Sequence, residues 1–349
     1  MLLSVRRQMS ALFVVGPHAG AHRVAVRAGI SMVVPLAGAV AVGQSDLLPY
    51  GAIGAFVALY GRHEQLRSRL AMQAQVGAAF ATAVLIGAVI AYSSHRIWLL
   101  APVAAVWAGL TAFASERGRW QPAGAVYPTF ALAAPATLPL HGSQGFWAVM
   151  AVAASAATGL LVTLLLPDLP DPSASVPPAS RLPATWESSV LRGHVVRHVA
   201  GIGAAGVLVA VTGLGHPYWT FITVSVPLAA PDIEGRLFRS AQRVLGTTAG
   251  LGVAAMVLCL HPAIYVTILL ISGLQFCTEL TTQRNYGLGL VFFTPAALLL
   301  GGIVLPAPSA SLIAQRAAET GLGLAIVVLV VVVEHRWSRR AVDRGRGQV

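Results

Sequence analysis

Long apolar runs separated by short polar breaks fill most of this 349-residue chain. A helix needs about 20 mostly apolar residues to cross a bilayer, so the pattern predicts about twelve transmembrane helices, six in each half. We expect these helices near residues 24–43, 47–60, 71–91, 97–115, 122–140, 146–166, 196–214, 217–230, 241–260, 262–279, 285–304 and 316–334.

A stretch rich in proline and serine, PDLPDPSASVPPASRLPATWESS, separates the two sets of runs. Such a composition is typical of a polar linker. The chain therefore divides into an N-terminal tail, a six-helix membrane repeat, a linker, a second six-helix repeat and a basic tail. Their expected bounds are residues 1–21, 22–166, 167–192, 193–334 and 335–349.

Composition places the chain in a membrane. It is 56% hydrophobic and only 10% charged, and its mean hydropathy is +0.74. The charged share of an ordinary soluble domain is about a quarter. Because so little charge cannot cover a core of this size in water, the expected fold class is an all-α polytopic membrane protein.

The arginines predict the topology, because positive residues are retained on the cytoplasmic side of a membrane. With twelve spans and a cytoplasmic N-terminus, every arginine except Arg96 and Arg316 lies inside, and so does the C-terminus. This placement explains the net charge of +11 without nucleic acid as a partner. The N-terminal sequence MLLSVRRQMSALFVVGPHAGAH looks like a signal peptide, but its brief apolar stretch favours an uncleaved cytoplasmic tail over cleavage.

The two halves share a faint internal repeat. At one constant offset Glu64 aligns with Glu234, and Arg69 aligns with Arg239. The segment YPTFALAAPATLPL parallels YGLGLVFFTPAALLL at a smaller offset, with Pro135 opposite Pro295, so the offset drifts along the chain. Because each copy has an even number of spans, both copies enter the membrane in the same direction. We therefore expect parallel repeats related by an axis along the membrane normal.

Two segments of the second half carry a resemblance to a known family. HPYWTFITVSVPLAAPDIEGRLFRSAQRVLGTTAGLG has an aromatic pair, a charged turn and Arg-x-x-Gly-Thr, and RNYGLGLVFFTPAALLL leads from Asn-Tyr to Thr-Pro. Together they resemble the fusaric acid resistance and aromatic acid exporter family. The matching residues are Tyr218, Trp219, Arg243, Gly246, Thr247, Asn285, Tyr286, Thr294 and Pro295.

The resemblance implies a plasma-membrane transporter that exports aromatic or other organic carboxylates. It also implies kinship with malate-permeable anion channels of plants, so a passive organic-anion channel is one alternative. A membrane scaffold without transport is another, and no residue pattern indicates an enzyme or a catalytic site. The expected partners are membrane lipid and a small organic anion, a homodimer rests on the resemblance alone, and no cofactor is expected.

The charged turn offers candidates for an anion pathway. Arg236, Arg239 and Arg243 share one face of a helix if that helix extends back through the turn. Arg243 lies inside a span, where it either begins the path of an organic anion or snorkels to lipid headgroups. For Arg236 a topological role in the loop is favoured. Arg69 is the matching candidate in the first half.

The runs 47–60 and 217–230 are too short to cross a bilayer upright, and they occupy matching positions in the two halves. Paired short or proline-interrupted segments are typical of a transport site. Tyr218 and Trp219 would stack there on an aromatic ring, or belong to an interfacial aromatic belt. Further candidates for the pathway are Thr247, Asn285, Tyr286, Thr294 and Pro295.

The sequence indicates residues for energy coupling or metal binding less clearly than residues for the anion pathway. Candidates for coupling are Glu279 and the neighbouring pair Arg316 and Glu319, which are spaced to pair on one helix. His194 and His198 have a metal-compatible spacing but lack a third ligand, so no metal site is predicted. The motif GIGAAG and the pair Gly246 and Gly250 favour helix packing instead of nucleotide binding.

Overall fold

A computed structural model describes residues 10–18, 20–62, 64–138, 140–167, 188–213, 217–230, 232–304 and 308–346. Over these residues the regular secondary structure is helical throughout. Residues 1–9 of the predicted tail and residues 168–187 of the predicted linker lie outside the described residues.

Each predicted apolar run coincides with a helix. The first half contains α2 (Ala21–Ala41), η1 (Ser45–Leu47), α3 (Leu48–Ala55), η2 (Phe56–Leu59), α4 (Leu66–Ala91), α5 (Arg96–Arg117), α6 (Val126–Thr137) and α7 (Gln144–Leu165). The second half contains α8 (Ser189–Thr212), α9 (Pro217–Leu228), α10 (Ile233–Cys259), α11 (Ile264–Thr282), α12 (Tyr286–Val304) and α13 (Ser309–Arg346).

The lengths of these helices agree with a multi-pass membrane protein. Nine helices within the described ranges are long and apolar enough to cross a bilayer, whereas α3, α6 and α9 are shorter. The chain is therefore an all-helical membrane protein with many spans. That all twelve runs cross, and that both termini are cytoplasmic, stay predictions.

Four helices, α4, α8, α10 and α13, begin five or more residues before their predicted starts near 71, 196, 241 and 316. α10 begins at Ile233 instead of near residue 241, because the Asp232 side chain caps it by accepting a 2.7 Å hydrogen bond from the Gly235 N–H. Glu234 in the first turn complements the helix dipole. The predicted charged turn is thus largely helix. α13 likewise begins at Ser309 instead of near residue 316, because a criterion of apolarity alone leaves out polar first turns.

The same pairs of helices pack together in both halves. α4 packs against α6 and α7 and α3 against α7, and in the second half α10 packs against α12 and α13 and α9 against α13. The halves also meet reciprocally, since α2 packs against α11 and α5 packs against α8. This matching supports the internal repeat, whose two copies and axis stay predictions.

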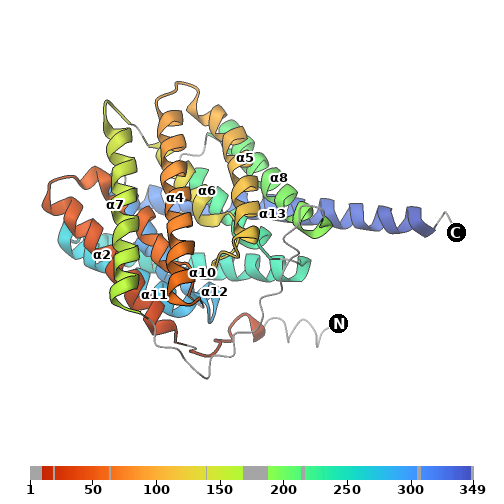
Figure 1. The fold of residues 1–349 in the computed structure, drawn as a ribbon. Coiled ribbons are helices and arrows are strands. Elements are labelled where there is room, and N and C mark those ends of the chain that lie inside the picture. The colour runs from red at the N-terminus through yellow and green to blue at the C-terminus, as the bar shows by residue number, and fades with distance from the viewer. Residues whose placement is uncertain are drawn as a thin grey trace.

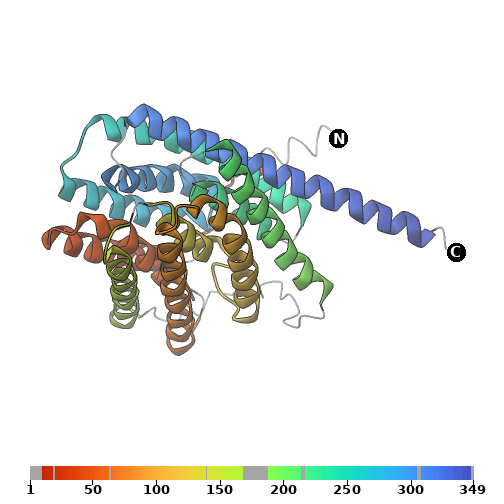
Figure 2. The same ribbon diagram turned by 90° about the horizontal axis from the view of Figure 1, so that it is seen from above.

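The helices of the two halves cross, and glycines allow them to approach closely. Figures 1 and 2 show α13 lying across the direction of α4 and α7. A Cβ added at Gly206 of α8 would lie 2.6 Å from the Cα of Ala101, and one added at Gly250 of α10 would lie 2.7 Å from the Cβ of Thr294. The predicted packing role of these glycines is confirmed.

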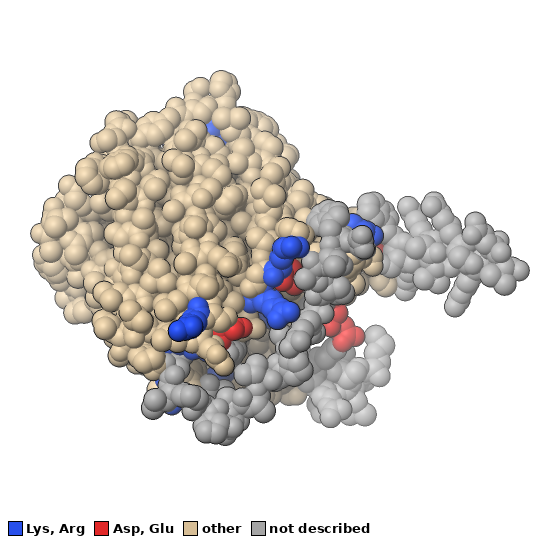
Figure 3. Space-filling view, in the orientation of Figure 1, with Lys and Arg blue, Asp and Glu red and all other residues tan. Residues whose placement is uncertain are grey.

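The outer surface is apolar. Val89, Val106, Leu165, Met256 and Leu269 are each more than half exposed. Figure 3 shows a broad uncharged face, with the charged side chains gathered toward one edge. Exposed apolar surface of this extent is typical of contact with a membrane.

Candidate functional site

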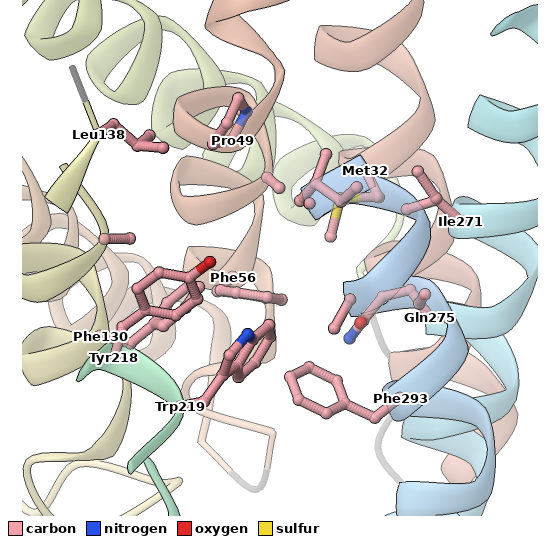
Figure 4. A pocket seen from close by; sticks show the side chains of 16 residues that line it. Met32, Pro49, Phe56, Phe130, Leu138, Tyr218, Trp219, Ile271, Gln275 and Phe293 are labelled. Atoms are coloured by element: carbon pink, nitrogen blue, oxygen red, sulfur yellow. The ribbon is translucent and has the colours of Figure 1, made fainter. Parts of the chain in front are cut away.

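A cavity of about 70 Å³ lies where the two halves meet. Residues of α2, α3, η2 and α6 line it from the first half, and residues of α9, α11 and α12 line it from the second. Its wall is mainly apolar, and Gln275 adds a side-chain amide (Figure 4). Five aromatic side chains take part, namely Phe56, Phe130, Tyr218, Trp219 and Phe293.

All five aromatic rings form a connected wall, which Phe56 joins through Phe130 at a ring-centroid distance of 6.4 Å. The ring centroids of Phe130 lie 5.7 Å from Tyr218 and 5.8 Å from Trp219, and Trp219 lies 6.2 Å from Phe293. Such separations are those of favourable aromatic pairs. The wall can therefore contact a further ring through the same interactions.

The sequence predicted only part of this wall. Tyr218 and Trp219 were predicted, and both are buried with 9% and 7% exposure, so they do not form an interfacial belt. Phe56, Phe130 and Phe293 were missed. They lie in ordinary apolar runs, and nothing in the sequence separates them from lipid-facing aromatics.

The short helix α9 holds the aromatic pair. Pro217 begins this helix, Pro227 lies inside it, and nearly all its side chains are buried. Because proline has no N–H, Pro227 leaves the carbonyl of Thr223 without its helical donor. The Thr223 hydroxyl donates a 2.8 Å hydrogen bond back to the carbonyl of Trp219. A buried helix with proline interruptions is typical of a transport site.

Arg316 of α13 lies beside Trp219. Its guanidinium carbon is 3.9 Å from the centroid of the Trp219 ring, a cation–π contact, and the side chain is only 1% exposed. A second cavity of about 10 Å³ is lined by Arg316, Glu319, Tyr218 and Trp219. The sequence placed Arg316 at the start of its span, whereas α13 begins at Ser309 and carries Arg316 two turns into the helix and into the protein. That Arg316 lies toward the outer side of the membrane stays a prediction.

Arg243 of α10 is fully buried between helices. Its Nε donates to the hydroxyl of Thr223 at 3.1 Å, and its guanidinium also donates to the hydroxyl of Tyr286 at 2.5 Å. Both partners are neutral. This burial between helices disfavours snorkelling to headgroups, and Arg243 lies within α10, one of the helices long and apolar enough to cross a bilayer. Its place on an anion pathway stays a prediction.

The other predicted arginines of α10 differ from Arg243. Arg236 is buried and forms an ion pair with Glu334, which also pairs with Arg197 at 3.2 Å. Arg236 thus lies in a helix and has a buried structural role that the sequence did not predict, and its role in topology stays a prediction. Arg239 is exposed, so it does not share the buried face of its two neighbours.

Glu279 of α11 is buried in an ion pair that joins the two halves. Its Oε2 lies 3.1 Å from a guanidinium nitrogen of Arg62, and its Oε1 accepts a 3.2 Å hydrogen bond from Gln275. Because Gln275 lines the aromatic cavity, this coupling candidate is connected to the cavity through one side chain. Sequence reasoning missed Arg62 as its partner.

Two further candidates hold the backbone in place. Arg69 donates to the carbonyls of Gly61 and Glu64 at 2.9 and 2.8 Å. Asn285 donates to the carbonyls of Leu12 and Val14 at 2.8 and 3.0 Å, which fixes residues 10–18 against the turn between α11 and α12. These contacts explain both side chains structurally.

Thr294 lies on the packing face between α10 and α12, and Thr247 and Pro295 are buried elsewhere on the same two helices without lining the cavity. Thr247 and Thr294 are buried, and Gly250 contacts Thr294. The residues that line the cavity from α12 are instead Phe293, Ala296, Ala297, Leu300 and Gly301. The sequence therefore found the right helix but not the side chains that face the cavity.

Comparisons with known proteins identify relatives of the second half of the chain. The chain is 27% identical over 130 residues to the uncharacterized membrane protein YvaC of Bacillus subtilis (strain 168). The match covers 35% of this chain and 20% of that relative. No solved structure matches the chain. Residues 204–330, from α8 to α13, match the model of the family described as fusaric acid resistance protein-like, and the predicted resemblance to that family is confirmed over this part of the chain.

Proposed function

We propose that the protein exports small organic carboxylates, aromatic ones among them, across the plasma membrane. The observation that carries this proposal is the aromatic cavity between the halves, with buried Arg316 beside it and buried Arg243 joined to its Trp219 through Thr223. Arg243 and Arg316 contact hydroxyl groups and an aromatic ring, whereas Arg62 and Arg236 are neutralised by acids. Among the described residues neither Arg243 nor Arg316 forms a salt bridge, and buried cations without one favour an anionic ligand, since charge inside a membrane protein must be compensated.

The cavity and the arginines together suit a substrate with an apolar ring and a negative group. Arg243 and Trp219 are joined through Thr223, whose hydroxyl bonds to both the Arg243 side chain and the Trp219 backbone. Arg316 stacks on the same tryptophan. The family match over residues 204–330 supports transport, and the aromatic wall supports the choice of substrate.

The mode of transport is a separate question. Glu279 and Glu319 are both buried, and they are the acids that a proton-coupled exporter would use. A passive organic-anion channel would need neither. A membrane scaffold would need neither acid and no anion site, which makes the two buried cations hard to explain in that alternative. Lipid surrounds the protein in each case, and a homodimer is compatible with all three.

Flux measurements from proteoliposomes test the proposal. A panel of aromatic and aliphatic carboxylates would be followed under a pH gradient, and then under a membrane voltage alone. We expect carboxylate flux that Arg243→Ala abolishes and Arg239→Ala leaves unchanged, because Arg239 is the exposed arginine of the same helix. Flux under voltage alone identifies a channel, and no carboxylate flux from folded protein contradicts the proposal.

A further inference from the structure

Arg316 is a buried cation with an unusual set of surroundings. Its side chain is 1% exposed, and none of its three guanidinium nitrogens has a hydrogen-bond partner among the described residues. A buried charged group without hydrogen bonds is strongly disfavoured. The face of the guanidinium lies over Trp219, and an arginine stacked in this way keeps its planar N–H fork available for a carboxylate.

The charges around Arg316 favour a ligand with one negative charge. The groups that act on its charge are the cation Arg243, the carboxylate of Glu319 and the hydroxyl groups of Tyr218 and Tyr286. With Glu319 ionised, the two arginines exceed the acids by one positive charge. A monoanion balances this excess, whereas a dianion overcompensates it.

The space beside Arg316 adjoins the aromatic cavity. The small cavity that Arg316 lines and the larger cavity share Tyr218, Trp219, Ala297 and Gly301 as walls. A negative group near Arg316 therefore lies next to a ring held by the aromatic wall. This arrangement requires the charged group and the ring to be close together in the ligand.

We propose that Arg316 is the carboxylate-binding residue of a subsite for aromatic monocarboxylates, with Trp219 positioning the guanidinium and the ring lying in the aromatic cavity. This inference rests on the proposed function and replaces the role in energy coupling predicted for Arg316. Arg316 determines specificity for charge, and the aromatic cavity determines specificity for shape.

Binding measurements on the purified full-length protein test the subsite. Benzoate is the charged probe, and benzamide is an uncharged probe of nearly the same shape, both titrated by calorimetry. Because charge-assisted bidentate hydrogen bonds are among the strongest, we expect Arg316→Gln to weaken benzoate binding by at least about tenfold. Benzamide affinity should not change, and Arg239→Gln, at an exposed position, should leave both affinities unchanged.

Two more variants keep the test decisive if Arg316→Gln folds poorly. Arg316→Lys keeps the charge but loses the planar fork, so benzoate affinity should fall at least about threefold. The double variant Arg316→Gln/Glu319→Gln removes both buried charges and should still lose the preference for benzoate over benzamide. Unchanged benzoate affinity in any folded variant of Arg316 overturns the inference, as does wild-type protein that binds no aromatic monocarboxylate.

The failure of this inference is distinguishable from the failure of the proposed function. If the wild-type protein transports carboxylates and the variants of Arg316 bind benzoate normally, only the subsite is wrong. If the wild-type protein transports no carboxylate, the proposed function fails whatever the binding measurements show.

Discussion

Arg62 and Glu279 form an ion pair with a nitrogen–oxygen distance of 3.1 Å, although they are far apart in the chain and belong to different halves. Arg62 lies between η2 and α4, and Glu279 lies near the end of α11. Through Gln275 the pair also contacts the wall of the aromatic cavity. Any movement that separates the halves at this point must break the pair.

Removal of one partner of this pair should destabilise the protein. Breaking a buried ion pair by removing one partner costs about 3–5 kcal/mol, because the other charge stays buried. We therefore expect Arg62→Gln to lower the melting temperature in detergent, and Arg62→Gln/Glu279→Gln to recover most of the loss. Glu234→Gln, at an exposed acid, serves as the control. If Arg62→Gln and Glu279→Gln each lower the melting temperature and the double variant shows the sum of the two decreases, the pairing is contradicted.

Substitutions of Arg236 and Arg239, two arginines in the first turns of α10, should differ in their effect on stability. Arg236 is buried, donates from Nε to the carbonyl of Ala230 at 3.1 Å and pairs with Glu334. Arg239 is exposed. In thermal unfolding, Arg236→Gln should lower the melting temperature strongly, and Arg239→Gln should hardly change it. Equal losses would mean that the first turns of α10 do not have the orientation described.

Two glycines of α10 give a matched test of helix packing. A Cβ at Gly250 would lie 2.7 Å from the Cβ of Thr294 and 2.8 Å from the carbonyl oxygen of Leu290, whereas Gly252 faces open space. Overpacking costs about 1–3 kcal/mol, so Gly250→Ala should lower the free energy of unfolding. Gly252→Ala should raise it by about 0.5–1 kcal/mol, because alanine stabilises a helix interior relative to glycine. Equal effects would contradict the close contact of α10 with α12.

Asn285 should control the order of the N-terminal segment. Its amide donates to the carbonyls of Leu12 and Val14, and the Arg284 carbonyl accepts a 2.8 Å hydrogen bond from the Gly16 N–H. We expect Asn285→Ala to increase hydrogen exchange across residues 10–18. Gln283→Ala, at an exposed neighbour, should not change the exchange. No increase in Asn285→Ala would show that the segment is held by other contacts.

The sequence alone predicted the helices well, because apolar runs report burial in protein or lipid directly. It placed Arg243 inside a span, and its family resemblance was confirmed over residues 204–330. The helix starts were less accurate at α4, α8, α10 and α13, where polar first turns continue the helix beyond the apolar run. Capping by Asp232 was readable from the sequence in principle.

The site was harder to predict for a physical reason. In a chain this apolar, no periodicity separates the side chains that face a cavity from those that face lipid, so Phe56, Phe130 and Phe293 carried no signal. The partners of buried charges also depend on packing between distant segments. The pairs Arg62–Glu279 and Arg236–Glu334 are therefore visible only in the fold.

In the proposed function the organic anion passes through the aromatic cavity, so a side chain that fills this cavity should stop transport. Ala297 lines both the aromatic cavity and the small cavity beside Arg316. Benzoate flux would be measured in proteoliposomes with Ala297→Trp, and with Val106→Trp at an exposed apolar position as the control. We predict that Ala297→Trp abolishes flux while Val106→Trp retains it. Wild-type flux through folded protein that carries Ala297→Trp would contradict the account.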